Sequence, residues 1–139
     1  MDIGAQAPPT VDTEKPQIGR FTANLAQAAA SYDLCTASGG GVVIDLEKLA
    51  IYVATAGATL TSVAIATNQT NPTTILSAVE GAVANLIAQK NLVRAIPSVG
   101  GLYLASGQKL RYTIVGATGT GSLLVTIPYM PVDSGARLI

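Results

Sequence analysis

The chain has 139 residues, enough for one domain that buries roughly 68% of its unfolded surface. Eight Lys and Arg residues balance eight Asp and Glu residues, so the basic footprint of a nucleic-acid-binding protein is missing. Hydrophobic residues make up 49% of the chain but aromatic residues only 4%, which favours β-sheets over a core centred on aromatic rings.

The first segment, residues 1–20, differs from the rest of the chain. It contains three prolines, five charged residues and little periodicity, so it buries too little apolar surface to fold alone. Two interpretations stay open: a frayed terminus, and an arm that becomes ordered on a neighbouring protein. For the second, the candidate partner contacts are Ile18 and Phe21.

Three candidate strands follow the arm. Residues 22–37 are ambiguous between helix and strand, and the alternation of their second half favours an extended run. Residues 38–41 contain three glycines and predict a turn before the apolar run Val42–Ile44. Residues 47–55 then alternate, with Leu49, Ile51 and Val53 on one face.

Residues 56–58 form a turn signal, and residues 60–67 alternate again with Val63 and Ile65 inward. Because short links favour sequential pairing, 47–55 and 60–67 are expected to pair as neighbouring antiparallel strands.

The next segment predicts one short helix or an irregular loop. Ser77–Glu80 matches a capping box, and Val79, Val83, Leu86 and Ile87 lie at helical spacing. Gly81 weakens such a helix, so both alternatives stay open over residues 77–90. Residues 73–76, 92–96 and 102–104 are further short apolar runs.

Residues 109–130 consist of two alternating runs joined by a glycine-rich segment. Leu110, Tyr112 and Ile114 share one side of the first run, and Leu123, Val125, Ile127 and Tyr129 share one side of the second. Gly116–Gly121 predicts a hairpin with a six-residue connection.

The chain beyond that hairpin is expected to leave the sheet. Pro128 and Pro131 place the end of the second run at a sheet edge. The tail is then expected to be irregular and free to meet a neighbour, with Val132, Leu138 and Ile139 as candidate partner contacts.

Short strands at roughly ten-residue spacing with glycine-rich turns define the expected fold class. It is all-β: an antiparallel β-sandwich of jelly-roll type, with an extended N-terminal arm and at most one short helix. The arm is residues 1–20, and residues 21–139 form a single jelly-roll domain.

No residue pattern indicates chemistry. The chain lacks histidine, which removes the usual metal ligand and the usual base of a Ser or Cys nucleophile. Asp45 and Glu47 are interpreted as the solvated end of a strand. Gly116–Gly121 is interpreted as a turn and not as a phosphate-binding loop, and Cys35 as a small buried residue. We therefore expect no enzyme, no catalytic or cofactor-binding residue, no cofactor and no metal.

The chain is also expected to have no membrane or secretory segment. The charge-free span Leu49–Val79 is long enough to cross a bilayer, but a polar cluster at residues 67–74 interrupts it. The chain begins Met-Asp, without the basic and apolar regions of a signal peptide.

The order of several segments resembles one family. The segments are Tyr32–Gly40, Leu49–Thr55, Leu60–Ile65 and Leu104–Leu110 continuing to Tyr129, and the resemblance covers about residues 22–131. In the order of these segments and the kind of residues they contain, the chain is similar to the small cement, or decoration, proteins of tailed-phage capsids.

The resemblance implies a jelly-roll subunit on the outer surface of a virion capsid, made in the host cytoplasm. Its partners would be the major capsid protein and a second or third copy of itself, as a homodimer or homotrimer, with no nucleic acid and no membrane. The alternative is a carbohydrate- or receptor-binding jelly-roll module of a virion appendage, which needs an exposed pair among the five Tyr residues.

Overall fold

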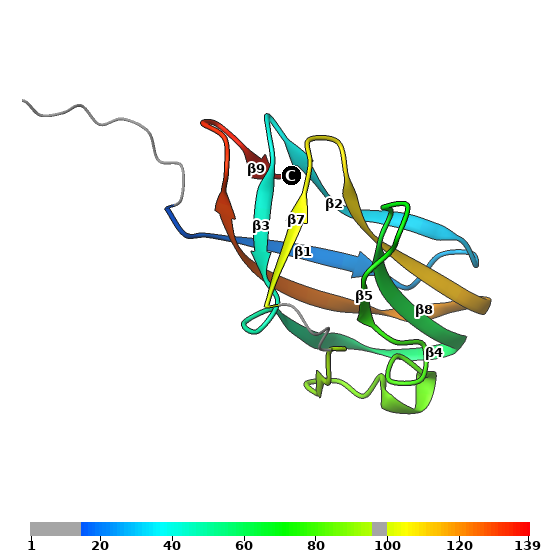
Figure 1. Cartoon of the computed structure of the whole chain (residues 1–139). Coiled ribbons are helices and arrows are strands. Elements are labelled where there is room, and N and C mark those ends of the chain that lie inside the picture. Colours follow the sequence, from blue (N-terminus) through cyan, green and yellow to red (C-terminus); the bar gives the residue numbers. More distant parts are fainter. Residues whose placement is uncertain (1–14, 96–99) are drawn as a thin grey trace, which may run out of the picture.

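The computed structural model describes residues 15–95 and 100–139, which form nine strands and one short 3-10 helix (Figure 1). The strands are β1 (Gln17–Asn24), β2 (Ser31–Ser38), β3 (Val42–Asp45), β4 (Ala50–Thr67), β5 (Thr74–Leu76), β6 (Asn91–Leu92), β7 (Gly101–Leu104), β8 (Lys109–Pro131) and β9 (Arg137–Leu138). The helix is η1 (Val83–Asn85).

The predicted fold class is confirmed: the described chain is all-β, and its paired strands are antiparallel. One curled sheet has the strand order β5-β4-β8-β2-β9. β1 and β3 also pair with β8, β6 pairs with β4, and β7 pairs with β3. β8 therefore lies at the centre of the molecule.

The predicted hairpin at Gly116–Gly121 is wrong. The two alternating runs do not pair with each other but continue as the single strand β8, and the two runs predicted around residues 56–58 likewise continue as β4. β4 and β8 pair with each other from Ala50↔Thr126 to Thr67↔Leu110. Both turn signals therefore belong to one long two-stranded ribbon.

The ribbon bends where its two glycine-containing segments face each other. The register shifts several times between Val53 and Ser62, and Thr59, Gly116 and Gly121 have positive φ values of 78°, 101° and 120°. Such bulges increase local bending and twist. The bend divides the sheet into two halves: β2 and β5 flank one, and β1, β3 and β6 flank the other.

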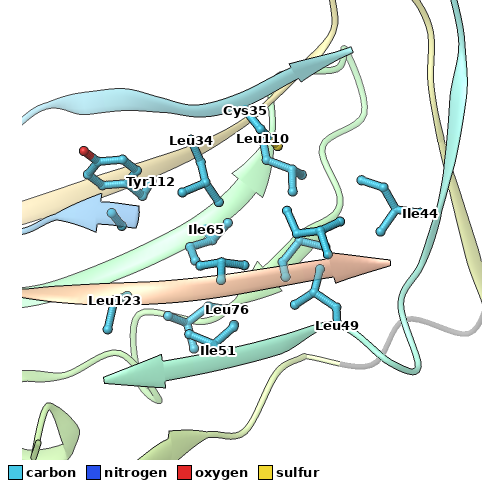
Figure 2. Close-up of a cluster of buried hydrophobic side chains, with 14 of the residues drawn as sticks. Leu34, Cys35, Ile44, Leu49, Ile51, Ile65, Leu76, Leu110, Tyr112 and Leu123 are labelled. Atoms are coloured by element: carbon cyan, nitrogen blue, oxygen red, sulfur yellow. The ribbon is translucent and has the colours of Figure 1, made fainter. Parts of the chain in front are cut away.

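The core lies between these halves, and its side chains come from the inward faces of both (Figure 2). Leu110 and Ile114 from the first half of β8 meet Leu123 and Val125 from the second half in one buried cluster. The side chains that periodicity placed inward in β4 and β8 are all buried. Alternation was therefore a sound guide to the core although the turns were misjudged.

The predicted boundary after residue 20 falls inside β1. Gln17 pairs with Tyr129, and the pairing continues to Asn24 and Ser122, so residues 17–20 belong to the sheet. Residues 1–14 of the expected arm lie outside the described residues.

Residues 132–136 of the C-terminal tail lie outside the strands, as expected, but the end of the tail is attached to the sheet. β9 pairs with the end of β2, and Thr36 and Ile139 exchange two backbone hydrogen bonds, of 2.8 and 2.9 Å. The Gly41 amide donates to the Asp133 carboxylate at 2.8 Å, which ties the start of the tail to β3. The end of the tail therefore forms an edge strand of the sheet, next to β2.

Candidate functional site

The five predicted partner contacts differ in how exposed their side chains are. Ile18, Val132 and Ile139 are exposed. Phe21 is half-buried and packs against the core, where its ring covers Gly19. Leu138 is buried in the core, so its side chain is not available at the surface of the described chain.

Ile18 forms one wall of an apolar groove of about 470 Å³ on the outer face of the sheet. The groove lies over neighbouring strands, because Ile18 on β1 is opposite Pro128 on β8, and Met130 on β8 is opposite Val43 on β3. Pro16 and Gly101 also line it.

Strand alternation explains why these apolar residues face outward. On β1, Ala23 is buried, so the residues in phase with it face the core and Ile18 faces solvent. On β8, Tyr129 and Pro131 are buried and Met130 between them is exposed. The groove is therefore fixed by the same register that builds the core.

Charged residues border the groove without being gathered into a reactive cluster there. Lys48 and Asp45 line it, and Arg20 is exposed on the same face of β1 as Ile18. The Asp45 carboxylate accepts a hydrogen bond from the Glu47 amide at 3.0 Å, consistent with the predicted strand end. The site can bind an apolar segment with a neighbouring charge.

A second set of exposed apolar side chains, the loop surface, comes from Val79 and Ile87 between β5 and β6 and from Val93 directly after β6. Val79, Ile87 and Val93 are 84%, 58% and 70% exposed. Helical spacing had grouped Val79 and Ile87 with Val83 and Leu86, but only a 3-10 turn forms and Leu86 alone is buried. Of the two predicted alternatives, a short helix and an irregular loop, the loop is the better description, and the exposure of these side chains was not predicted by either.

Hydrogen bonds hold this loop in place. Ser77 Oγ accepts from the Glu80 amide at 3.1 Å, which is half of the predicted capping box. The Glu80 carboxylate does not return to Ser77 but accepts from the Val93 amide at 2.8 Å. Lys90 Nζ donates to Asn85 Oδ1 at 3.2 Å. The loop therefore presents its apolar side chains from a braced backbone.

The two surfaces lie on opposite sides of the β4–β8 ribbon, the loop beside β4 and the groove over β1 and β8. Leu92 on β6 is opposite Ile51 on β4, Ile51 is opposite Val125 on β8, and Val125 is opposite Phe21 on β1. The loop thus flanks the β4 side, whereas β1 flanks the β8 side. A molecule with this arrangement can contact two partners at once.

The tyrosines do not form the exposed pair that a sugar-binding site needs. Tyr112 and Tyr129 are buried, Tyr32 and Tyr52 are half-buried, and Tyr103 is exposed. The Tyr112 hydroxyl accepts from Gln27 Nε2 at 2.9 Å, and its ring stacks on Tyr32 with centroids 5.5 Å apart.

The titratable groups with shifted pKa values lie away from both surfaces. A hydrogen bond from Lys109 Nζ, 2.6 Å from Asp33, lowers the pKa of Asp33 against the opposing effect of burial, with Lys109 and Arg111 charges adding to the lowering. Burial raises the pKa of Cys35 to about 12, as befits a core thiol.

Among residues 15–95 and 100–139, no three His, Cys, Asp or Glu side chains are grouped to hold a metal ion. No helix in the same ranges is long and apolar enough to cross a membrane.

No protein-family model matches the sequence, and no curated protein matches it. Solved structures similar to the chain include three from viral particles. A chain of the cyanophage Pam1 capsid asymmetric unit is 14% identical with a TM-score of 0.44, over 93% of this chain and 94% of that one. A chain of the virus-like particle of extra small virus from the giant freshwater prawn Macrobrachium rosenbergii is 12% identical with a TM-score of 0.40, over 95% and 88%. VP2 of the infectious bursal disease virus subviral particle is 11% identical with a TM-score of 0.38, over 99% of this chain and 44% of that one. Similarity of this extent carries no functional conclusion.

Proposed function

We propose that this protein is a non-enzymatic structural component of a virion, a cement protein that binds the outside of a phage capsid and bridges neighbouring major capsid proteins. The observation that carries the proposal is the pair of apolar surfaces on opposite sides of the β4–β8 ribbon. A bridging protein can bind the shell through one surface and join a second copy through the other, and a small domain that presents two apolar surfaces suits that task. The resemblance of residues 22–131 to cement proteins supports the same conclusion.

We assign the loop surface to the capsid. Val79, Ile87 and Val93 are exposed on and beside the loop, and removing them from water on contact supplies binding free energy without ion pairs. Because a protein that binds only the assembled shell stabilises that shell by mass action, occupancy raises the resistance of the capsid to rupture.

The first experiment compares capsids that carry the protein with capsids that lack it. Heating at low ionic strength should release DNA from the bare capsids at a lower temperature than from the decorated ones, with release followed by a DNA-binding dye. Equal release temperatures at full occupancy would contradict the proposal.

The second experiment tests the loop surface. The triple variant Val79→Ser, Ile87→Ser and Val93→Ser should keep the melting temperature of the free protein within a few degrees and lose most capsid binding in a co-sedimentation assay. The control variant Ala78→Ser, Ala84→Ser and Ala88→Ser changes three other exposed positions of the same loop and should bind normally. Normal binding by the first variant would assign the capsid contact to another face.

A further inference from the structure

We infer that the groove over β1, β8 and β3 is the docking site for residues 1–14 of a second copy of this chain. The inference concerns self-association in solution, and it stands whether or not the capsid role is correct.

The position of the groove favours this segment as its occupant. Pro16 and Ile18 line the groove, so the chain joins β1 directly at its margin. Fourteen residues reach at most roughly 48 Å when extended, whereas a folded chain of this length has a radius of gyration of about 14 Å. The segment is therefore long enough to cross to a neighbouring molecule.

The chemistry of the segment complements the groove. Residues 1–14 contain Ile3 and Val11, the pair Pro8-Pro9, and three acidic residues with no Lys or Arg. Proline-rich segments favour the polyproline II conformation and dock on apolar grooves at little entropic cost. The groove lining contains Lys48 and Asp45, whose charges balance, and Arg20 adds a positive charge on the same face of β1 as Ile18.

The residue before β1 favours exchange between copies over binding within one copy. Proline disfavours the helical backbone region for the residue that precedes it, so Pro16 holds Lys15 extended. A chain that leaves β1 in an extended direction does not reverse at once into the groove beside its own strand. In a reciprocal exchange between two copies, or in an exchange around a ring, every segment is bound and every groove is filled.

The experiment uses two defective chains that complement each other. A chain lacking residues 1–14 keeps the groove, and the variant Ile18→Glu keeps the segment but places a negative charge where an acidic segment must bind. By multi-angle light scattering, the full chain should be an oligomer and each defective chain a monomer. An equimolar mixture of the two should form heterodimers, because one segment and one groove remain.

The variant Ile87→Glu is the matched control, since Ile87 and Ile18 are both 58% exposed but lie on different surfaces. It should remain oligomeric, and thermal melts should show all variants folded. A second measurement follows the anisotropy of a labelled peptide with the sequence of residues 1–14. Titration with the truncated chain should give saturable binding, weakened at least tenfold by adding Ile18→Glu to that chain.

The inference is overturned by a monomeric full chain, by an oligomer that persists after truncation, or by a mixture that does not associate. Failure of capsid binding in the loop variant bears only on the proposed function, because that variant keeps both the groove and residues 1–14.

Discussion

Gly119 and Ala58 touch where the β4–β8 ribbon bends, and the backbone at Gly119 is so close to the Ala58 carbonyl oxygen that a Cβ at position 119 would overlap it. Two glycine-containing segments far apart in the sequence are thus fitted to each other, and the fold depends on the missing side chain.

Gly119→Ala should therefore destabilise the protein, by about 1–3 kcal/mol if the backbone shifts to relieve the overlap. Urea unfolding followed by circular dichroism measures the loss. Gly100→Ala is the control, because its Cβ would meet Glu47 Oε2 at an ordinary 3.7 Å. Equal stability of the two variants would show that the ribbon does not pack as described.

The tail offers a test of its attachment to β2. Leu138 is 7% exposed and Ile139 is 57% exposed, and the Ile139 backbone, not its side chain, bonds Thr36. Leu138→Ser should cost about 2–4 kcal/mol, whereas Ile139→Ser should change the free energy of unfolding by less than about 0.5 kcal/mol. A tail that is free to move would make both substitutions neutral.

Asp33 makes stability depend on acid pH. Its lowered pKa means that its ion pairs with Lys109 and Arg111 stabilise the fold above the ordinary value of 3.8, and this stabilisation is lost as pH falls through the lowered pKa. Because the carboxylate is 44% exposed, Asp33→Asn should cost only about 0.5 kcal/mol at pH 7.

Urea titrations at pH 7 and pH 2 measure the Asp33 effect, and the difference between wild type and variant should vanish at pH 2. A double-mutant cycle with Lys109→Met assigns the coupling to that pair. A difference that persists at pH 2 would attribute the effect to packing and not to charge.

Cys35 should be protected from alkylation in the folded protein. With the pKa raised from 9.0 to about 12, the thiolate fraction at pH 8 falls about a thousandfold relative to the unfolded chain. Iodoacetamide followed by mass spectrometry should show slow labelling that becomes fast in urea. Equal rates in both states would place the thiol at the surface.

The same shift gives a dependence on alkaline pH. The folded state disfavours the thiolate, so the stabilisation from the neutral thiol is present below pH 9 and is lost as pH rises toward 12. The stability advantage of wild type over Cys35→Ala should therefore shrink over that range.

Local periodicity predicted which side chains are buried but not how the strands connect. Leu49, Ile51 and Val53 are buried as expected, because alternation depends only on a strand having one dry face. The segments 56–58 and 116–121 were interpreted as turns because glycine suits both a turn and a bulge. Each segment becomes a bulge only because it faces the other, and a local pattern contains no information about its partner.

The candidate site was predicted in part. Ile18 was named from the arm, but the groove also needs Met130 and Val43, which meet only through the pairing of β1, β3 and β8. The exposure of the loop surface was not predicted by either alternative for residues 77–90, and the Glu80 carboxylate bonds the Val93 amide and holds the segment as a loop.

The bent β4–β8 ribbon also has a consequence for how the molecule folds. Both halves of the sheet take their central strands from the same two segments, which lie far apart in the sequence, so neither half contains a complete set of local partners. Bringing β4 and β8 together costs conformational entropy before either half of the sheet can form. Folds with such long-range strand pairing therefore fold slowly. Once the ribbon is paired, the two halves are mechanically one unit, and losing one removes the central strands of the other.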